Sequence, residues 1–349
     1  MLATAPKASR PSIGAAFFAG SSFAWKQIKE LAGPFLKQVA DRMAAQVKAF
    51  DPALTAYAEY ALTNQGKQLR PVLVGLSAGA TGPIQPSHVT LAVIIETVHL
   101  ATLVHDDVMD EATIRRGRPT VAARWGNDLS VLLGDCLFAH ALKLAAGFPT
   151  TDVCRAVSGS TLTVCTGEII QNKRRGNFQL SRDEYFNVLG MKTGELFALA
   201  CEMGAFLNGA PKATQNALRQ YGMNLGTAYQ MFDDCMDVFG TEATAGKSLG
   251  TDLAKGKLTL PVLLLLERLP PQERAALQEA LGQWEPKKLP WLLGLLKEHN
   301  ALKESQLLIH DYLNSGRQHL AALPDSPHRQ ALGALADFLA AQTDALGGS

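Results

Sequence analysis

The chain has 349 residues, 47% of them hydrophobic, and a formal net charge of +1 at pH 7. This length and composition predict a globular protein with a large core. The near-neutral charge gives no broad basic face, so we expect no nucleic-acid partner. The five cysteines are scattered and lack C-x-x-C pairs, which argues against disulfides and zinc and favours a cytoplasmic location.

Residues 1–27 are interpreted as a loose N-terminal extension. Lys7 and Arg10 precede a mildly apolar stretch of small residues, and the first acid is Glu30, a pattern that faintly resembles a targeting segment. Because glycine and serine dilute the apolar stretch, we favour the loose extension, and a targeting role stays the alternative.

From Ile28 almost to the end, apolar residues recur at helical spacing and alternating strand patterns are scarce. The sequence therefore predicts a single all-α domain over residues 28–349, joined by short loops. The segments 89–110 and 213–239 are apolar nearly all round, which is typical of helices inside a bundle. No uninterrupted apolar run reaches the ~20 residues that span a bilayer, so we expect a soluble or peripheral protein.

Two acidic motifs share the spacing D-D-x-x-D. They lie in "LVHDDVMDEATIRRGRPT" and "YQMFDDCMDVFG", and the aspartates are Asp106, Asp107, Asp110, Asp233, Asp234 and Asp237. On a helix, positions i and i+4 share one face, so each motif presents several carboxylates close together. Such a group of carboxylates needs a cation to offset its mutual repulsion. Oxygen ligands without His or Cys suit Mg²⁺, which completes its coordination with phosphate oxygens. The two motifs predict a diphosphate held through several Mg²⁺ ions.

Basic residues near predicted helix ends complete this prediction, because arginine forks bind phosphate oxygens and lysine adds a point charge. They are Lys67, Arg70, Arg115, Arg116, Lys192, Lys247 and Lys257. The basic run 173–175 is interpreted as a solvated loop, with anionic lipid binding as the alternative. The motifs of nucleotide-binding loops are absent from the sequence.

Seven segments together resemble the trans-isoprenyl diphosphate synthases, from about Ala32 to the end. They are "GKQLRP", "HLATLVHDDVMDEATIRRGRPT", "VLLGDCLFAHAL", "TGEIIQ", "MKTGELF", "YQMFDDCMD" and "GTDLAKGKLTLP". The resemblance implies an isoprenoid synthase-type helical bundle around a central substrate cavity, usually as a homodimer. It also implies a prenyltransferase that condenses an allylic diphosphate with isopentenyl diphosphate.

The same resemblance implies roles for individual residues. The six aspartates would hold three Mg²⁺ ions against the allylic diphosphate. Isopentenyl diphosphate would be gripped by Lys67, Arg70, His99 and Arg116. The allylic diphosphate would be surrounded by Arg115, Lys192, Thr193, Gln230 and Lys247, supported by Asp252 and Lys257.

Product length is predicted from the residues before the first motif. Thr102 lies one helical turn, ~5.4 Å, before Asp106, with Ala101 beside it and Val98 a further turn away. Short-chain members of the family typically place Phe or Tyr at this level, so the small residues indicate an open tunnel and an octaprenyl or nonaprenyl product. Small residues that merely permit close helix packing are the alternative. A long apolar product makes transient membrane association plausible.

Three other functions stay open. The first is a short-chain farnesyl or geranylgeranyl diphosphate synthase, disfavoured only by Ala101 and Thr102. The second is a non-catalytic regulatory subunit of a heteromeric synthase, although such subunits tend to lose the aspartate motifs. The third is a terpene cyclase, whose second metal motif normally mixes Asn or Asp, Ser or Thr, and Glu.

Overall fold

The computed structural model describes residues 23–63, 66–241 and 249–347, and it is almost entirely helical, as predicted. The helices are α2 (Phe23–Gln46), α3 (Thr55–Leu62), α4 (Leu69–Thr81), α5 (Pro86–Met109), α6 (Val121–Trp125), α7 (Asn127–Ala146), α8 (Asp152–Lys173), α9 (Arg182–Leu189), α10 (Glu195–Phe206), α11 (Lys212–Phe239), α13 (Thr251–Ala254), α14 (Leu260–Arg268), α15 (Pro271–Gly282), α16 (Leu289–Glu298), α17 (Ala301–His319) and α18 (Pro327–Asp344). Short turns of 3₁₀-helix form η1 (Val47–Ala49), η3 (Pro286–Lys288) and η4 (Leu320–Ala322), and η2 (Gly190–Gly194) is π-helical.

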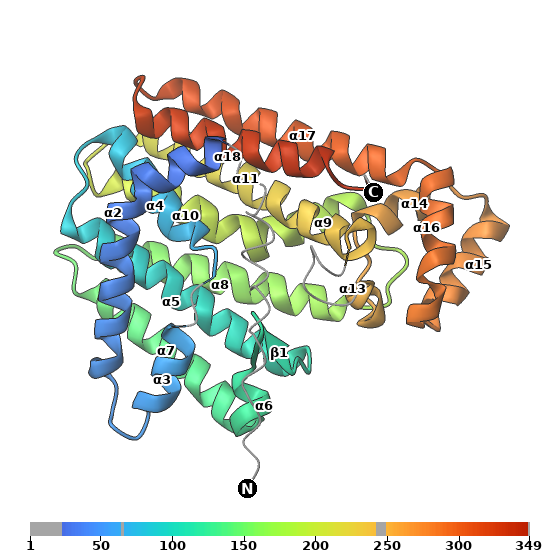
Figure 1. Ribbon diagram of the computed structural model, residues 1–349, viewed down its shortest axis with the longest axis horizontal. Coiled ribbons are helices and arrows are strands. Elements are labelled where there is room, and N and C mark those ends of the chain that lie inside the picture. Colours follow the sequence, from blue (N-terminus) through green and yellow to red (C-terminus); the bar gives the residue numbers. More distant parts are fainter. Residues whose placement is uncertain (1–22, 64–65, 242–248, 348–349) are drawn as a thin grey trace, which may run out of the picture.

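The long helices form a bundle around α5, α10 and α11 (Figure 1). Helix α10 packs between α4 and α11, α5 packs against α4 and α7, and α17 covers α11. Leu91, Ile94 and Ile95 of α5 are completely buried, because this helix has neighbours on several sides. The all-round apolar pattern of α5 therefore indicates a central helix, as predicted.

Helix α2 begins at Phe23, inside the segment predicted as a loose extension. Trp25 is 5% exposed and stacks on Phe338 of α18, with ring centroids 5.5 Å apart. Trp25 therefore packs onto α18, whereas residues 1–22 and the predicted targeting role lie outside the described residues.

A small β-hairpin follows the first aspartate motif, which the helical pattern did not indicate. Strands β1 (Ile114–Arg115) and β2 (Arg118–Pro119) pair antiparallel through the turn residues Arg116 and Gly117. Their φ angles, 53° and 74°, are both in the left-handed region, as in the type I′ turn of a two-residue hairpin. The hairpin projects consecutive arginines beside the end of α5.

By length and composition, α5 and α7 are both apolar enough to cross a membrane, although polar residues interrupt the apolar run in each helix. The most apolar window of α5 is 72% buried inside the bundle, as expected for the central helix of a globular domain. That of α7 is only 39% buried, so α7 presents an apolar outer face.

Candidate active site

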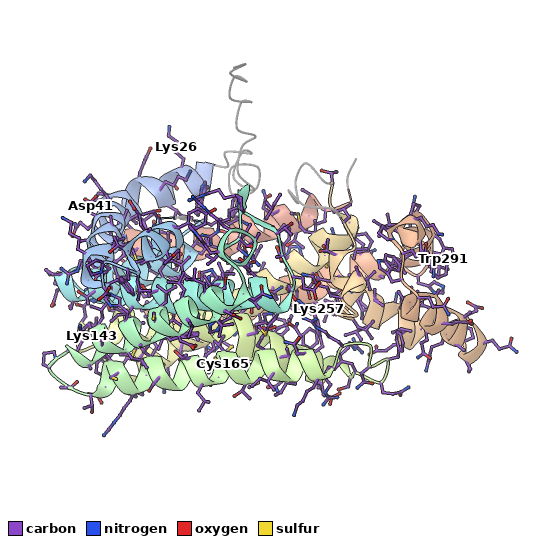
Figure 2. The ribbon with its side chains drawn as sticks, turned by 90° about the horizontal axis from the view of Figure 1, so that it is seen from below. Lys26, Asp41, Lys143, Cys165, Lys257 and Trp291 are labelled. Atoms are coloured by element: carbon purple, nitrogen blue, oxygen red, sulfur yellow. The ribbon has the colours of Figure 1, made fainter. Side chains whose placement is uncertain are left out.

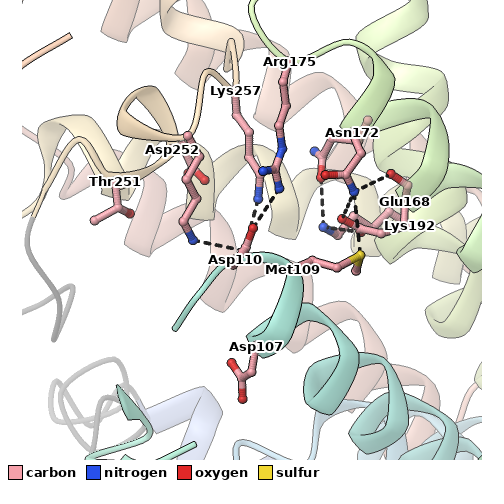
Figure 3. Close-up of polar contacts among 12 residues, drawn as sticks. Asp107, Met109, Asp110, Glu168, Asn172, Arg175, Lys192, Thr251, Asp252 and Lys257 are labelled. Atoms are coloured by element: carbon pink, nitrogen blue, oxygen red, sulfur yellow. Dashed lines mark hydrogen bonds and ion pairs between the residues drawn. The ribbon is translucent and has the colours of Figure 1, made fainter. Parts of the chain in front are cut away.

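The first aspartate motif occupies the last turn of α5, where the helix carbonyls already make the environment unfavourable for acids. Asp107 is 5% exposed, and its Oδ1 accepts a hydrogen bond of 2.6 Å from Nε of Arg115 on the hairpin. Asp110 caps the helix and points away from Asp107, towards Arg175 and Lys257 (Figure 3). Nearby cations thus compensate these carboxylates from two sides.

The three carboxylates of this motif differ in their electrostatics. Burial raises the pKa of Asp106 to about 6, because the Lys192 ammonium only partly offsets desolvation. Burial also raises the pKa of Asp107, against the opposing effect of Arg115. At Asp110, burial is outweighed by Lys257 and Lys255, which lower its pKa to about 2. The cations near Asp106 and Asp107 therefore do not fully offset the cost of burying these two negative charges.

The second motif lies near the end of α11. Asp233 is exposed, whereas Asp234 is buried and accepts a hydrogen bond of 2.6 Å from the Tyr185 hydroxyl. Burial, with a further contribution from Asp252, raises the pKa of Asp234 to about 7. Within this motif, Asp233 is therefore exposed to solvent, whereas Asp234 is buried and hydrogen-bonded.

Asp237 is completely buried, and its two carboxylate oxygens bond to α13. Oδ1 accepts from the Thr251 hydroxyl at 2.7 Å, and Oδ2 accepts from the backbone N–H of Asp252 at 3.0 Å. In this structure Asp237 fastens α13 to α11, a structural role that D-D-x-x-D spacing alone does not predict.

Lys192 and Thr193 lie in η2, the π-helical turn between α9 and α10. Such turns are frequent at functional sites because they widen the helix locally. Lys192 Nζ lies 2.5 Å from Oε2 of Glu168 and donates to Oε1 of Gln171 at 2.9 Å. Burial lowers the pKa of Lys192, but Asp106 and Glu168 outweigh that effect and raise it overall. Lys192 is therefore a fixed positive charge facing the first motif.

Thr193 connects this turn to the second motif. Its hydroxyl donates to Oε1 of Gln230 at 2.8 Å, and Nε2 of Gln230 donates to Oδ1 of Asp234 at 2.9 Å. Because both partners of Gln230 are fixed, its amide has one orientation and the Asp234 carboxylate is held from two directions. The structure thus brings together the predicted residues Thr193, Gln230 and Asp234.

A second cationic group forms where the start of α4, the middle of α5 and the hairpin meet. Lys67 Nζ donates to the Tyr229 hydroxyl at 3.1 Å. Burial lowers the pKa of Arg70 and of Arg116, and Glu96 partly opposes this at both guanidinium groups. Burial and then Arg70, Arg116 and Arg115 lower the pKa of His99 well below its usual value, so this imidazole is neutral among cations.

The predicted chain-length residues lie on α5 as expected from helical spacing. Val98 and Ala101 are 1% and 0% exposed, whereas Thr102 is partly exposed and its hydroxyl donates to the His99 carbonyl at 2.7 Å. Of these three positions, only Thr102 has appreciable accessible surface. The open tunnel remains a prediction.

The structure also places residues that the sequence motifs did not single out as site residues. Glu168 and Gln171 hold Lys192, and both belong to the segment "TGEIIQ", which carried the family resemblance. No sequence motif pointed to Tyr185, whose hydroxyl donates to Asp234. Arg175 was expected in a solvated loop, but its side chain is 27% exposed and paired with Asp110, because that loop folds back over the site. Lys247 lies outside the described residues.

The donor set fits a hard divalent cation that shares its ligands with phosphate. Among the residues that the structure describes, no three Asp, Glu, His or Cys side chains converge closely enough to hold a metal by themselves. The available donors are carboxylate oxygens. Asp107 and Asp234 are buried and Asp106 is partly buried, and burial raises the pKa of all three in spite of the cations nearby. Mg²⁺ suits this arrangement, because it keeps several waters and completes its shell with substrate phosphates.

Comparison with known proteins agrees with this geometry. The family described as Polyprenyl synthetase matches residues 51–292. Octaprenyl diphosphate synthase of Haemophilus influenzae is 32% identical over 311 residues, 89% of this chain and 94% of that protein. A short chain isoprenyl diphosphate synthase of Methanothermobacter thermautotrophicus is 29% identical over 90% of this chain and 98% of that protein. The crystal structure of polyprenyl synthase from Caulobacter crescentus, complexed with calcium and isoprenyl diphosphate, matches with a TM-score of 0.84 and 33% identity over 96% of this chain and 99% of that chain.

The chain therefore belongs to the polyprenyl synthetase family. It is a prenyltransferase, and its activity is that of a trans-polyprenyl diphosphate synthase.

Proposed function

We propose that this enzyme extends an allylic diphosphate such as farnesyl diphosphate with successive isopentenyl diphosphates to an octaprenyl or nonaprenyl diphosphate, using three Mg²⁺ ions. The observation that carries the long product is the small Thr102 side chain, which is partly exposed one turn before Asp106. The 32% identity to an octaprenyl diphosphate synthase supports the same product class.

In this proposal the allylic diphosphate lies between the two aspartate motifs. Asp106, Asp107, Asp110, Asp233, Asp234 and Asp237 would hold Mg²⁺, although Asp237 also fastens α13. Bound Mg²⁺ supplies positive charge that stabilises the departing diphosphate. Lys192, kept charged by Asp106 and Glu168, adds a fixed cation aimed at the same leaving group.

The second cationic group suits isopentenyl diphosphate. Lys67, Arg70 and Arg116 would bind its diphosphate, and the neutral His99 can donate a hydrogen bond without adding repulsion. Its double bond attacks the allylic cation left when diphosphate departs, and a proton is then lost. In line with the family, the departed diphosphate would accept that proton. Each cycle lengthens the product by one isoprene unit. Burial of that unit in the protein is favourable by ~0.8 kcal/mol per CH₂.

The purified protein, incubated with Mg²⁺, farnesyl diphosphate and labelled isopentenyl diphosphate, should give a ladder of products that ends at octaprenyl or nonaprenyl diphosphate. The dephosphorylated products are separated by chain length. Arrest after the first addition would replace this product class with a short-chain one. Cyclic hydrocarbon from farnesyl diphosphate alone would indicate a cyclase, and absent incorporation would indicate a regulatory subunit.

A homodimer through the outer faces of α7 and α8 forms part of the proposal. Leu132 and Val131 of α7 are 64% and 43% exposed, and Leu162 and Ile169 of α8 are 70% and 57% exposed. Helix α8 lies on the outside of the bundle, where Cys165 marks it in Figure 2. So many exposed large apolar side chains on neighbouring helices are typical of an interaction surface. A second copy of the chain is the partner that the family resemblance implies.

Leu132→Glu should convert the dimer to a monomer, because an uncompensated charge would be buried at the contact, costing several kcal/mol. Sedimentation velocity measures the result. Leu307→Glu is the matched control, since Leu307 is 57% exposed on α17, away from this surface, and this variant should remain dimeric. A monomeric wild-type protein, or a dimeric Leu132→Glu variant, would contradict the proposed interface.

The proposed location is cytoplasmic. The five cysteines are all unpaired in the structure, in keeping with a reducing compartment. Transient contact with a membrane would occur through the apolar product rather than through α5, most of whose apolar surface is buried in the bundle.

A further inference from the structure

Three cations from two separate loops gather around Asp110 at the edge of the site (Figure 3). Arg175 lies 2.9 Å from Oδ1 of Asp110. Lys255 and Lys257 lie 3.0 and 3.4 Å from Oδ2. We call Arg175, Lys255 and Lys257 the cation clamp. The family resemblance pointed to Lys257, whereas Arg175 and Lys255 come from the structure alone.

The backbone builds this clamp independently of Asp110. Arg175 follows α8, and Lys255 and Lys257 follow α13. The two loops are joined directly, because the N–H of Gly176 donates to the carbonyl of Gly256 at 2.8 Å. Both glycines have left-handed φ angles, 71° and 69°, and a Cβ on Gly256 would lie only 3.3 Å from the Gly176 nitrogen. The left-handed φ angles favour glycine at both positions, and the missing side chain at Gly256 also allows the close approach of the two loops.

The charges of the clamp are not balanced by the protein. Asp110 is the acidic partner of all three cations, and no other acidic partner of theirs lies within ion-pair distance among the described residues. Nε of Arg175 is also buried without a hydrogen-bond partner among the described residues. The side chains of Lys257 and Arg175 are only 10% and 27% exposed, so water compensates their charge incompletely. Such a cluster has capacity for a further anion.

The position of the clamp identifies the chemistry of that anion. Asp110 belongs to the first aspartate motif, and Lys192 belongs to the same group of polar side chains at the end of α5 (Figure 3). The clamp and Lys192 therefore face one region beside the first motif. An anion carrying several charges and several oxygens fits a guanidinium and two ammonium groups better than a single carboxylate does.

We propose that Arg175 and Lys255 bind, together with Lys257, the diphosphate group in the allylic site. This inference rests on the proposed function and extends its set of binding residues. The group has two sources, the allylic substrate and the inorganic diphosphate that each condensation releases. The competing interpretation is that the cations only fix Asp110 at the end of α5.

The experiment compares Arg175→Gln and Lys255→Gln with Arg174→Gln, a matched control in the same loop. Arg174 pairs with Glu184 instead of Asp110. Calorimetric titration with inorganic diphosphate and Mg²⁺ measures binding without turnover. Each of the two clamp variants should bind about 10- to 100-fold more weakly, as expected for the loss of a charge-assisted hydrogen bond, and the control within about twofold of wild type.

Steady-state kinetics separate the two sources of diphosphate. A raised KM for the allylic substrate, with KM for isopentenyl diphosphate within about twofold, shows that the clamp holds the substrate. Weakened inorganic diphosphate binding with an unchanged allylic KM shows that it holds the released product. Each of these two results supports the clamp. The Arg175→Lys variant keeps the positive charge and should retain most of the affinity for inorganic diphosphate.

Unchanged affinity for inorganic diphosphate together with an unchanged allylic KM would overturn the inference. An equal rise in both KM values, accompanied by a lower Tm, would also overturn it in favour of a structural role. These results are distinct from failure of the proposed function. A wild-type protein that binds diphosphate without extending the allylic chain would contradict only the function, and active variants with unchanged binding would contradict only the clamp.

Discussion

Asp106→Asn should lower turnover by at least about 100- to 1,000-fold, as expected when preorganised stabilisation of a charged leaving group is removed. The substitution keeps the shape of the side chain and removes only the charge that faces Lys192 and the proposed Mg²⁺ ions. Initial rates with labelled isopentenyl diphosphate measure the loss, and a Mg²⁺ titration should show weaker activation.

The fold should tolerate this substitution. Burial raises the pKa of Asp106 to about 6 from its ordinary value of 3.8, so the ionised carboxylate is less favourable in the folded protein than in the unfolded chain. At neutral pH the charge of Asp106 therefore contributes no stability, and the neutral Asn variant should have an unchanged or higher Tm. Thermal unfolding, followed in the absence of substrate, measures this part.

Asp41→Asn is the control, because the Asp41 side chain is 68% exposed on α2 and its pair with Lys37 is worth little. It should match wild type in both measurements. Nearly full activity of Asp106→Asn would remove Asp106 from the proposed metal ligands. A clear loss of Tm would instead mean that its charge supports the fold.

Thr102→Phe should shift the product from octaprenyl or nonaprenyl diphosphate towards farnesyl or geranylgeranyl diphosphate. The new ring would lie one helical turn, ~5.4 Å, before Asp106, where it would block a growing tail. Thr102 is a better position than Ala101, because Thr102 is partly exposed whereas Ala101 is completely buried and a larger side chain there would overpack the core. Product length, read after dephosphorylation, measures the shift.

Thr102→Val is the matched control. It removes the hydroxyl that donates to the His99 carbonyl within the helix but keeps the size of the side chain. If size decides product length, Val should leave the ladder unchanged. A ladder from Thr102→Phe as long as that of wild type would contradict a tunnel past Thr102, and small residues would then serve only close helix packing.

The correct predictions from sequence are those that depend on short-range spacing. The apolar pattern of residues 89–110 correctly predicted a buried helix, because a helix surrounded by others has few polar positions. The motif "MKTGELF" also pointed to Lys192 and Thr193, which lie beside the two aspartate motifs in the structure, and their role in binding the diphosphate stays a prediction. Family membership followed from the same motifs.

The roles of individual carboxylates did not follow from spacing. Asp233 and Asp237 are four residues apart on α11, yet Asp233 is exposed and Asp237 is fully bonded to α13. The two-residue turn at Arg116 and Gly117 was also not predicted, since four strand residues give no periodic signal.

By itself, the sequence determined the helical class and the family, and it predicted which aspartates and cations bind a diphosphate, because periodicity and motif spacing are local properties of the chain. Only the tertiary structure decided which carboxylates have too little positive charge nearby to offset their burial. It also decided which cations outnumber the carboxylates beside them. Arg175 and Lys255 are 80 positions apart, and a hydrogen bond between the Gly176 and Gly256 backbones sets their loops side by side. Burial and charge balance depend on such contacts between distant segments, which local sequence patterns do not specify.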